Sequence, residues 1–518
     1  MNKVKILLPL LIFTMLFANA AHAYEKEIYL QPTRVEIHKQ STNTLTLNGL
    51  YKITDKASMV EYFVTSNGPV ALAMSNNEVN LTHLGASIKS LVGFNIDELK
   101  GSEKIVVFSS ETIGRKSAIS TSDPAIIYKA LQGAIKVGEF TNSLGELWYN
   151  VETSTGSRNW VPSTKTTIES IPALSLGKSG NGIRYRGSFE VNKLTSSTLQ
   201  TVNKLDIEQY LKGVVASEMP STWHLEALKA QAIAARGYAL KSTGILSSTT
   251  SSQVYKGYSN EVVSTNNAID QTKGKVLLYT GKLAQTYFYS TSGGRTANVG
   301  DVWNSNQASF PYLVSVDDST EVSPYSNWVV EIPASSILTR FGYLTTNQLL
   351  DVKLAKGGAN GEVTAVTIVT NVGEKTIVGN EAVMRGIFKN PLKNNVSLNS
   401  NWYNISYTKP TVSSQVFIQQ SSSISSPIAS LLNYTVQTAT GTSIISNDNV
   451  MVQTNSGIVP ASISAGITSV TVTGKGYGHR IGMSQYGAKA KADGGWNAER
   501  ILKHYYTGTT IGNVTDVR

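Results

Sequence analysis

The chain of 518 residues contains no cysteine. This excludes a disulfide framework, a thiolate metal site and a lipid attached to an N-terminal cysteine. Histidine is scarce as well, with six in the whole chain. The five beyond the N-terminal segment are dispersed: His38, His83, His224, His479 and His504. Metal ligands have to converge, so we expect no tightly held metal ion, and we expect no cofactor.

Long apolar runs are also missing beyond residue 23, since no later stretch approaches the ~20 residues that span a bilayer. At the N-terminus, Lys3 and Lys5 precede an uncharged apolar run from Ile6 to Ala20, and Ala-His-Ala23 follows. A basic start, a short apolar core and a small-x-small exit are typical of a secretory signal peptide. A membrane anchor is the alternative, but the run is too short for one. We therefore predict a secreted protein, cleaved after Ala23.

The formal net charge is +10, and no dense cluster of Lys and Arg accounts for it. Loss of Lys3 and Lys5 with residues 1–23, which contain no Asp or Glu, lowers it to +8. A basic exported protein is drawn to polyanions by long-range fields, which predicts retention by anionic cell-wall polymers. Nucleic acid is the alternative partner, but the charge is diffuse and no binding motif is present. We therefore predict no nucleic-acid binding.

The length predicts two to four domains, and no repeat of 20–50 residues runs along the chain. Residues 24–100 mix strand-like pieces with polar turns. Residues 101–165 alternate apolar and polar residues between glycine-bearing turns, which predicts a small β module. Its Trp148-Tyr-Asn-Val segment and the later Trp160-Val resemble the bacterial SH3-like repeats that accompany cell-wall enzymes. A β spacer without a binding function is the alternative, and Ser, Thr and Gly near 165–185 mark its boundary.

A helix is predicted over residues 222–241. Ser221 or Thr222 can cap its start. Apolar residues recur on one stripe at spacings of three and four: Leu225, Leu228, Ala232, Ala235 and Ala239. Lys229 and Arg236 stand seven residues apart on one common face. Two cations on one face can hold a substrate carboxylate or stabilise developing charge.

Glu218 lies between the apolar segment 213–217 and this helix. A carboxyl group there is partly desolvated, and its proton affinity depends on that burial and on nearby charges. Glycosidic cleavage needs such a tuned carboxylic acid to protonate the leaving oxygen. The alternative is that Glu218 only caps a helix or pairs locally, and the pattern alone does not choose between the two.

Two glycine-bearing loops follow. Residues 274–281 and 284–290 predict two strands around a Gly-Lys turn, leading into Ser290-Thr-Ser-Gly-Gly-Arg-Thr. Glycine lets a ligand approach the backbone, so free N–H groups there can bind hydroxyl and acetamido groups. The second loop, Gly474-Lys-Gly-Tyr-Gly-His-Arg, precedes a helix predicted near 484–506. No Gly-Lys-Ser/Thr and no βαβ unit accompanies its glycines, so we reject a nucleotide site.

Five motifs occur in one order along this part of the chain: Tyr210-Leu-Lys-Gly-Val-Val-Ala-Ser-Glu-Met-Pro, Glu226-Ala-Leu-Lys-Ala-Gln-Ala-Ile-Ala-Ala-Arg, Ser290-Thr-Ser-Gly-Gly-Arg-Thr, Pro311-Tyr-Leu-Val-Ser-Val-Asp and Gly478-His-Arg-Ile-Gly-Met-Ser-Gln-Tyr-Gly-Ala. Together they resemble the SpoIID/LytB proteins, which comprise stage II sporulation protein D and the amidase enhancers. The resemblance covers residues 174–511, with an inserted segment predicted around 410–470.

This resemblance implies a role in remodelling bacterial peptidoglycan. Sporulation members are lytic transglycosylases that cut glycan strands, and the essential Glu of their Glu-Met-Pro motif aligns with Glu218. Amidase-enhancer members are associated with stimulating an N-acetylmuramoyl-L-alanine amidase, and the larger exported build here looks more like that branch. The chain departs from the family pattern at His224, where Pro is common, at Tyr289, where His is frequent, and at Arg480, where Gly is usual. Some relatives bind zinc through Cys and His, which the lack of cysteine argues against here.

We therefore predict an α+β, β-rich multidomain protein with one prominent helix after the Glu-Met-Pro motif and a C-terminal helix. The predicted activity is lytic transglycosylase-like cleavage of peptidoglycan glycan strands, with Glu218 as general acid and base. A non-catalytic amidase enhancer and a plain wall-anchored structural protein are the alternatives. The predicted substrate-binding residues are Lys229, Arg236, Ser290, Ser292, Gly293, His479, Ser484 and Gln485. For His479, a structural role remains open.

Overall fold

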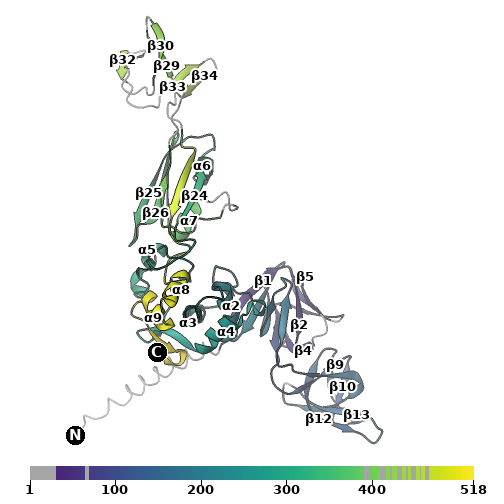
Figure 1. Ribbon diagram of the computed structural model, residues 1–518. Coiled ribbons are helices and arrows are strands. Elements are labelled where there is room, and N and C mark those ends of the chain that lie inside the picture. Colours follow the sequence, from purple (N-terminus) through teal and green to yellow (C-terminus); the bar gives the residue numbers. More distant parts are fainter. Residues whose placement is uncertain are drawn as a thin grey trace, which may run out of the picture. The chain divides into compact units, whose positions relative to one another are not determined.

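A computed structural model of the chain is shown in Figure 1. It describes residues 31–64, 69–83, 85–153, 155–389, 394, 396–408 and 466–517, and short strands between 416 and 460. The predicted signal peptide and its cleavage site lie outside the described residues. Strands outnumber helices and several sheets are present, which confirms the β-rich α+β fold class. Within the described part of the chain, no helix combines the length and the apolar character needed to cross a membrane.

The chain divides into two compact units. The first comprises Met1–Thr286, Asn497–Glu499 and Thr509–Arg518, and the second comprises Tyr287–Trp496 and Arg500–Gly508.

Two sheets of the first unit are built from strands far apart in sequence. One has the order β20-β1-β19-β18-β8-β3-β4 and the other β17-β16-β2-β5-β6-β7. Alternate residues of β2 are buried, because successive side chains of a strand point to opposite faces. Residues 33–98 thus share both sheets with residues 176–205, so the sheets join the predicted N-terminal region to the beginning of the family-like region. Their bounds are β1 (Thr33–Gln40), β2 (Thr42–Asn48), β3 (Tyr51–Asp55), β4 (Glu61–Val64), β5 (Pro69–Ser75), β6 (Glu78–His83), β7 (Ala86–Ser90), β8 (Gly93–Glu98), β16 (Leu176–Ser179), β17 (Arg184–Tyr185), β18 (Ser188–Lys193), β19 (Leu199–Leu205) and β20 (Leu246–Ser247).

A third sheet of the first unit uses only residues 104–170, in the order β11-β10-β14-β13-β12-β9-β15. The Trp148-Tyr-Asn-Val segment lies in β13 and pairs antiparallel with the Trp160-Val segment in β14. Phe108 and Tyr128 stack in its core at 4.0 Å between ring centroids. The likeness to SH3-like repeats stays a prediction. The bounds are β9 (Lys104–Phe108), β10 (Thr112–Arg115), β11 (Pro124–Tyr128), β12 (Gly133–Thr141), β13 (Leu147–Glu152), β14 (Arg158–Pro162) and β15 (Thr166–Ser170).

Three helices of the first unit pack against one another: α2 (Ile207–Glu218), α3 (Leu225–Lys241) and α4 (Val263–Gln271). Helix α3 is the predicted prominent helix, but it begins three residues later than expected. The segment before it turns, with the N–H of Trp223 donating to the carbonyl of Pro220. The N-cap is therefore His224, whose Nδ1 accepts from the N–H of Glu226, and the predicted cap by Ser221 or Thr222 is wrong.

Helix α2 was not predicted, because its run of Gly, Val and Ala was interpreted only as a packed segment. Asp206 caps its start by accepting from the N–H groups of Glu208 and Gln209. A small sheet β22-β21-β37 completes this unit, with β21 (Lys275–Tyr279), β22 (Lys282–Leu283) and β37 (Thr510–Asn513). A hairpin joins β21 to β22, but the predicted second strand over 284–290 is wrong. β22 ends at Leu283, and within 284–290 only Phe288–Tyr289 form a strand, which does not pair with β21.

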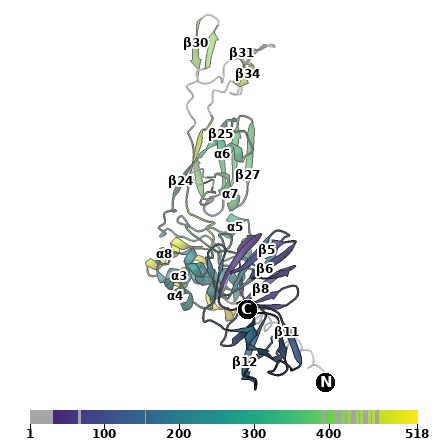
Figure 2. The same ribbon diagram turned by 90° about the vertical axis from the view of Figure 1, so that its right-hand side faces the viewer.

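The second unit packs α6 and α7 against two three-stranded sheets, β24-β35-β28 and β25-β26-β27, as Figure 2 shows from a second side. Its core includes Ile332, Val366, Met384 and Tyr403. The bounds are β23 (Phe288–Tyr289), β24 (Trp328–Pro333), β25 (Leu349–Gly357), β26 (Glu362–Thr370), β27 (Gly373–Val378), β28 (Tyr403–Ser406), β35 (Ser469–Gly474), β36 (Met483–Ser484), α5 (Val299–Trp303), α6 (Ala334–Arg340) and α7 (Glu381–Ile387).

The predicted C-terminal helix near 484–506 is in fact two helices, α8 (Gln485–Asp493) and α9 (Ala498–Tyr505). Gly494 ends α8, and Gly495 follows with a φ of +85°, a backbone conformation that suits glycine. Three hairpins are described in the predicted inserted segment 410–470, and its remaining residues up to 465 lie outside the described part of the chain. They are β29 (Val416–Gln420) with β30 (Ser423–Ile428), β31 (Thr435–Thr438) with β32 (Gly441–Ile444), and β33 (Met451–Thr454) with β34 (Gly457–Pro460).

Candidate functional site

Glu218 is the last residue of α2, and Met219 caps the end of that helix. Val214 and Val215, one turn earlier, are fully buried, whereas Glu218 itself is half-buried. Its Oε1 accepts a hydrogen bond from the backbone N–H of Val254 at 2.7 Å. The half-buried position agrees with the sequence-based expectation. The carboxylate, however, ends one helix instead of standing at the start of the next.

The loop that carries Val254 is fixed on both sides. Gln253 donates from Nε2 to the carbonyl of Ala235 in α3 at 3.2 Å and accepts from the hydroxyl of Tyr210 at 2.9 Å. On the other side, the hydroxyl of Tyr255 donates to Asn203 at 2.7 Å. The N–H group that orients Glu218 is therefore held by the two helices and the sheet. A backbone donor has no sequence signature, so the sequence could not reveal it.

The negative charge of Glu218 affects the pKa values of two tyrosines. Burial raises the pKa of Tyr210 well above its ordinary value, and the negative charge of Glu218 raises it further. Burial likewise raises the pKa of Tyr238, with Glu218 as an additional cause. Both phenols therefore stay protonated near neutral pH. The two phenols beside Glu218 are thus uncharged near neutral pH.

Lys229 lies on α3 with its side chain 20 % exposed, and its Nζ pairs with Glu226 Oε1 at 2.8 Å. Glu226 in turn accepts from the N–H of Ala498 through its second oxygen at 2.7 Å. Lys229 therefore keeps partial access to solvent, as a substrate-binding cation requires, while its ion pair restrains it.

Arg236 is fully buried. It donates from Nε and Nη2 to the two carboxylate oxygens of Glu208 at 2.9 and 2.6 Å, and from Nη1 to the carbonyl of Lys275 at 3.0 Å. Glu208 also accepts from the N–H of Gly274 at 3.1 Å. This arrangement ties α3 to α2 and β21, and it does not support the predicted role in substrate binding. Lys229 and Arg236 do not present a shared exposed face. An arginine inside an alanine-rich helix face needs a buried carboxylate partner, which could have pointed to Glu208.

In the second unit, the Ser-Gly loop is folded around Glu321. The N–H groups of Ser292 and Gly293 donate to Glu321 at 2.7 and 3.0 Å, and the side chain of Ser292 is fully buried. Burial raises the pKa of Glu321 above its ordinary value, although these two hydrogen bonds act to lower it. The backbone donors expected to be free for a ligand are therefore used internally. Ser290, half-buried beside Thr291, keeps more access.

Ser484 joins the same cluster. Its hydroxyl donates to Glu321 Oε2 at 2.5 Å and accepts from the N–H of Gly487 at 3.1 Å, which makes it the N-cap of α8. Gln485, the first residue of α8, is 7 % exposed. Glu321 thus holds the Ser-Gly loop and the start of α8 together. Sequence reasoning missed it, because it lies outside the five motifs.

His479 is surrounded by aromatic rings. The centroids of Trp303, Tyr289 and Tyr287 lie 4.9, 5.3 and 6.3 Å from the imidazole centroid. Its Nδ1 accepts from the N–H of Ile481 at 3.1 Å. Burial, together with the positive charge of Arg385, lowers the pKa of His479 to about 3. The imidazole is therefore neutral near pH 7, which favours a structural or hydrogen-bonding role over proton transfer.

Arg480 stands where the family usually has glycine, and its φ of +65° explains that usage. The side chain is fully buried and donates to Glu362 Oε1 at 3.1 Å, to the carbonyl of Ser292 at 3.1 Å and to that of Arg295 at 3.0 Å. Its guanidinium also lies 4.2 Å from the ring centroid of Trp402. The arginine thus connects the Gly-His loop to the Ser-Gly loop.

The predicted site residues divide between the two units. Glu218, Lys229 and Arg236 belong to the first, and the remaining six belong to the second: Ser290, Ser292, Gly293, His479, Ser484 and Gln485. Within the second unit, the structure brings Ser292, Gly293 and Ser484 together on Glu321. No group of three or more His, Asp or Glu side chains among the described residues is placed to hold a metal ion.

Comparison with known proteins gives a consistent result. The family model of the stage II sporulation protein, SpoIID, matches residues 195–279, which contain β19, the three helices α2–α4 and β21. The amidase enhancer of Bacillus subtilis (strain 168) is 29 % identical over 480 residues, which is 87 % of this chain and 63 % of that protein. This chain thus spans less than two-thirds of the enhancer's length.

Two further relatives are similar over a shorter stretch. An uncharacterised protein of Brachyspira hyodysenteriae is 30 % identical over 339 residues, covering 64 % of this chain and 73 % of the relative. Stage II sporulation protein D of Bacillus subtilis is 28 % identical over 334 residues, covering 60 % of this chain and 76 % of the relative.

Proposed function

The chain belongs to the SpoIID/LytB family, and on that basis we propose that it is an exported cell-wall protein that cleaves peptidoglycan glycan strands by lytic transglycosylation, with Glu218 as general acid and then general base. One observation carries the proposal: a half-buried carboxylate in the Glu-Met-Pro motif, oriented by the N–H of Val254 at 2.7 Å. A fixed acid within reach of a leaving oxygen is what glycosidic cleavage requires.

The proposed reaction has two proton transfers and consumes no water. Protonated Glu218 gives its proton to the glycosidic oxygen between N-acetylmuramic acid and N-acetylglucosamine, and the bond from C1 of the muramoyl residue to that oxygen breaks. The Glu218 carboxylate then takes the proton of the muramoyl 6-hydroxyl, whose oxygen attacks C1 and closes a 1,6-anhydro ring. One carboxyl group suffices because the nucleophile belongs to the substrate, unlike the two-carboxylate arrangement of ordinary glycosidases.

The surroundings of Glu218 suit this double role. The hydrogen bond from Val254 fixes one oxygen of the carboxyl group. Glu218 is half-buried, and a glycan is proposed to reach its carboxyl group from the exposed side. Lys229, partly exposed on α3, is proposed to approach a substrate carboxylate. We propose a structural role for Arg236 and no role in substrate binding, because its N–H groups donate to Glu208 and to the carbonyl of Lys275.

A second candidate function is stimulation of an N-acetylmuramoyl-L-alanine amidase without glycan cleavage. The observation that favours it is the similarity to the amidase enhancer of Bacillus subtilis over 87 % of this chain. In that case the protein would bind the wall and expose it to the amidase. Glu218 would then have a structural role and no catalytic one.

Peptide-free glycan strands separate the two functions. The lytic enzyme releases products with 1,6-anhydromuramoyl ends, which mass spectrometry identifies, and Glu218→Gln abolishes them. The enhancer releases none but accelerates digestion of whole peptidoglycan by added amidase.

Export and wall retention are part of the proposal. The N-terminal pattern predicts release after Ala23, and the diffuse positive charge predicts attraction to anionic wall polymers. N-terminal sequencing of the protein recovered from the wall fraction tests the first point, since it should begin at Tyr24. Elution from isolated walls by salt tests the second, because screening weakens long-range attraction.

A further inference from the structure

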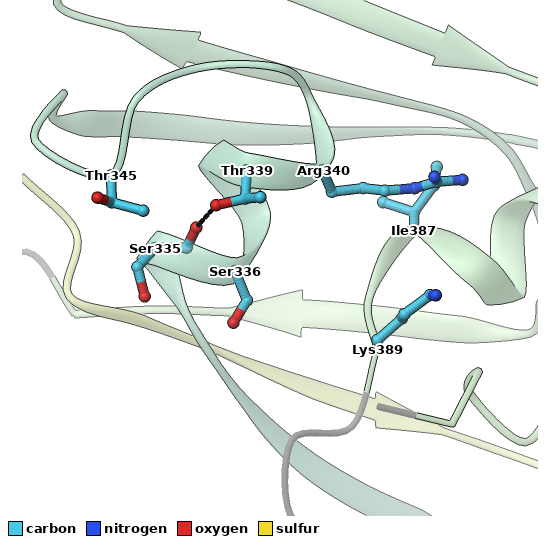
Figure 3. A pocket seen from close by; sticks show the side chains of 7 residues that line it. All are labelled: Ser335, Ser336, Thr339, Arg340, Thr345, Ile387 and Lys389. Atoms are coloured by element: carbon cyan, nitrogen blue, oxygen red, sulfur yellow. Dashed lines mark hydrogen bonds between the residues drawn. The ribbon is translucent and has the colours of Figure 1, made fainter. Parts of the chain in front are cut away.

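The second unit contains an open cavity of about 490 Å³ that shares no residue with the predicted site (Figure 3). It lies between α6 and the end of α7. Seven described residues line it: Ser335, Ser336, Thr339, Arg340, Thr345, Ile387 and Lys389. Its volume falls within the ~300–1,000 Å³ range of ligand pockets. Four hydroxyl groups and two cations line it, and none of the described lining residues is acidic.

The two cations gather at one end of the cavity. Figure 3 shows Arg340 and Lys389 reaching toward the same side, next to Ile387. Neither side chain makes a hydrogen bond or ion pair with any residue that the structure describes. Nearby cations of this unit are engaged differently: Arg385 pairs with Glu381 at 2.6 Å, and Lys375 donates to the carbonyl of Phe341 at 3.1 Å. The cavity therefore presents two positive charges without a compensating carboxylate among its described walls.

Hydroxyl groups occupy the other end, where Figure 3 places Ser335, Ser336 and Thr345. Thr339 donates its hydroxyl proton to the carbonyl of Ser335 at 2.8 Å, so its oxygen faces a ligand only as an acceptor. The remaining hydroxyls both donate and accept. A cationic end and a hydroxyl-lined end match a ligand that carries both an anionic group and free hydroxyls.

We propose that this cavity binds a phosphodiester of a polyol phosphate chain, the chemistry of an anionic wall polymer. Arg340 and Lys389 bind the phosphate oxygens, since the guanidinium fork matches phosphate geometry and an ammonium group adds a point charge. The serine and threonine hydroxyls at the other end of the cavity bind the polyol unit attached to the phosphate. The biological ligand rests on the proposed export to the wall, but the site does not depend on Glu218 or on glycan cleavage.

A purely structural explanation exists for each cation. Arg340 ends α6 and Lys389 follows α7, so both can offset the partial negative charge of carbonyl groups at helix ends. That explanation predicts a loss of stability without a loss of binding when the charges are removed. The experiment therefore measures both quantities.

The test is isothermal titration of the full mature chain with a short poly(glycerol phosphate) oligomer at 0.15 M salt, where long-range attraction is screened. Arg340→Gln with Lys389→Gln should weaken binding at least about tenfold, since charge-assisted hydrogen bonds are lost. The matched control, Lys353→Gln with Lys356→Gln, removes the same charge from exposed positions of β25 and should change the affinity less than about twofold.

A third variant protects the test against misfolding. Ser336→Glu places a negative charge inside the cavity, in the first turn of α6, where an acidic residue suits the helix. It should also weaken binding about tenfold or more, with unfolding temperature unchanged. Three results would overturn the proposal: no binding by the wild type, equal weakening in the control, or equal affinity for a polygalacturonate of matched charge, which would indicate diffuse charge or carboxylate binding. Absence of anhydromuramoyl products would refute the lytic function and leave this titration unaffected.

Discussion

The carboxylate of Glu218 accepts a hydrogen bond from the backbone N–H of Val254, with 2.7 Å between Oε1 and the amide nitrogen. If this bond positions the acid, Val254→Pro, which removes the donor, should lower kcat about 10- to 100-fold. KM should stay within about twofold, because glycan binding does not use this group. Val254→Ala keeps the N–H and should retain most of the activity. Equal kcat values for the two variants would show that the hydrogen bond has no positioning role.

Arg236 and Lys229 are expected to differ in what they affect. Arg236→Gln leaves Glu208 buried without its partner and should lower the free energy of unfolding by about 3–5 kcal/mol. Lys229→Gln breaks a partly exposed ion pair and should change that free energy by less than about 1 kcal/mol, while raising KM severalfold. Denaturant titration and steady-state kinetics on both variants measure these effects. If Arg236→Gln were as stable as the wild type and had a raised KM, Arg236 would have a role in substrate binding.

Arg480 has a φ of +65°, which is unfavourable for a residue with a side chain, and it forms an ion pair with Glu362. We expect this ion pair to offset the backbone strain. Arg480→Gly relieves about 1–2 kcal/mol of backbone strain but leaves Glu362 buried and unpaired, so the net change should be destabilising by roughly 2–3 kcal/mol. Adding Glu362→Gln to Arg480→Gly should recover part of the loss, because the uncompensated charge disappears. A double-mutant cycle measured by chemical denaturation gives the coupling. Strictly additive effects would mean that the pair contributes nothing.

His479 predicts a pH dependence of stability. Its folded pKa of about 3 lies below the ordinary value of 6.5, so the unfolded chain takes up this proton first as the pH falls. The contribution of His479 is complete above about pH 6.5 and is lost progressively toward pH 3. His479→Phe keeps an aromatic ring and should reduce the drop in unfolding temperature between pH 7 and 5. Burial also lowers the pKa of His504, which acts in the same direction in both proteins and cancels in the comparison. Identical slopes for wild type and variant would contradict the assignment.

Glu321 gives a test for the order of the Ser-Gly loop. It accepts from the N–H groups of Ser292 and Gly293 and from the hydroxyl of Ser484. Glu321→Ala leaves these donors unsatisfied and should cost about 2–4 kcal/mol of stability. Amide exchange at Ser292 and Gly293 should accelerate well above the change expected from global destabilisation. Glu331→Ala, an exposed position of β24, is the control and should leave exchange in the loop unchanged.

Features set by residues close together in the sequence could be predicted, whereas contacts between residues far apart in the sequence could not. The stripe of Leu and Ala residues predicted α3 because helix periodicity is local. The apolar run before Glu218 similarly predicted its half-buried position. The partners of Arg236 and Ser292 lie 28 and 29 residues away, so only tertiary structure identifies them.

The pairing of strands into sheets could not be predicted from the sequence for the same reason. Thr33 pairs with Leu205, and nothing in either segment specifies the other. The two helices predicted as one, α8 and α9, show the opposite case, since Gly494 and Gly495 are a local break signal that could have been used.

The most direct test of the central claim is the product analysis of peptide-free glycan strands incubated with the mature protein. Wild type should release fragments with 1,6-anhydromuramoyl ends, and Glu218→Gln should release them at least about 1,000-fold more slowly, since loss of the general acid and base removes both proton transfers. Glu331→Gln, the same change at an exposed strand position, should match the wild type. Equal product release by Glu218→Gln and wild type, or no anhydro products from the wild type, would contradict the account.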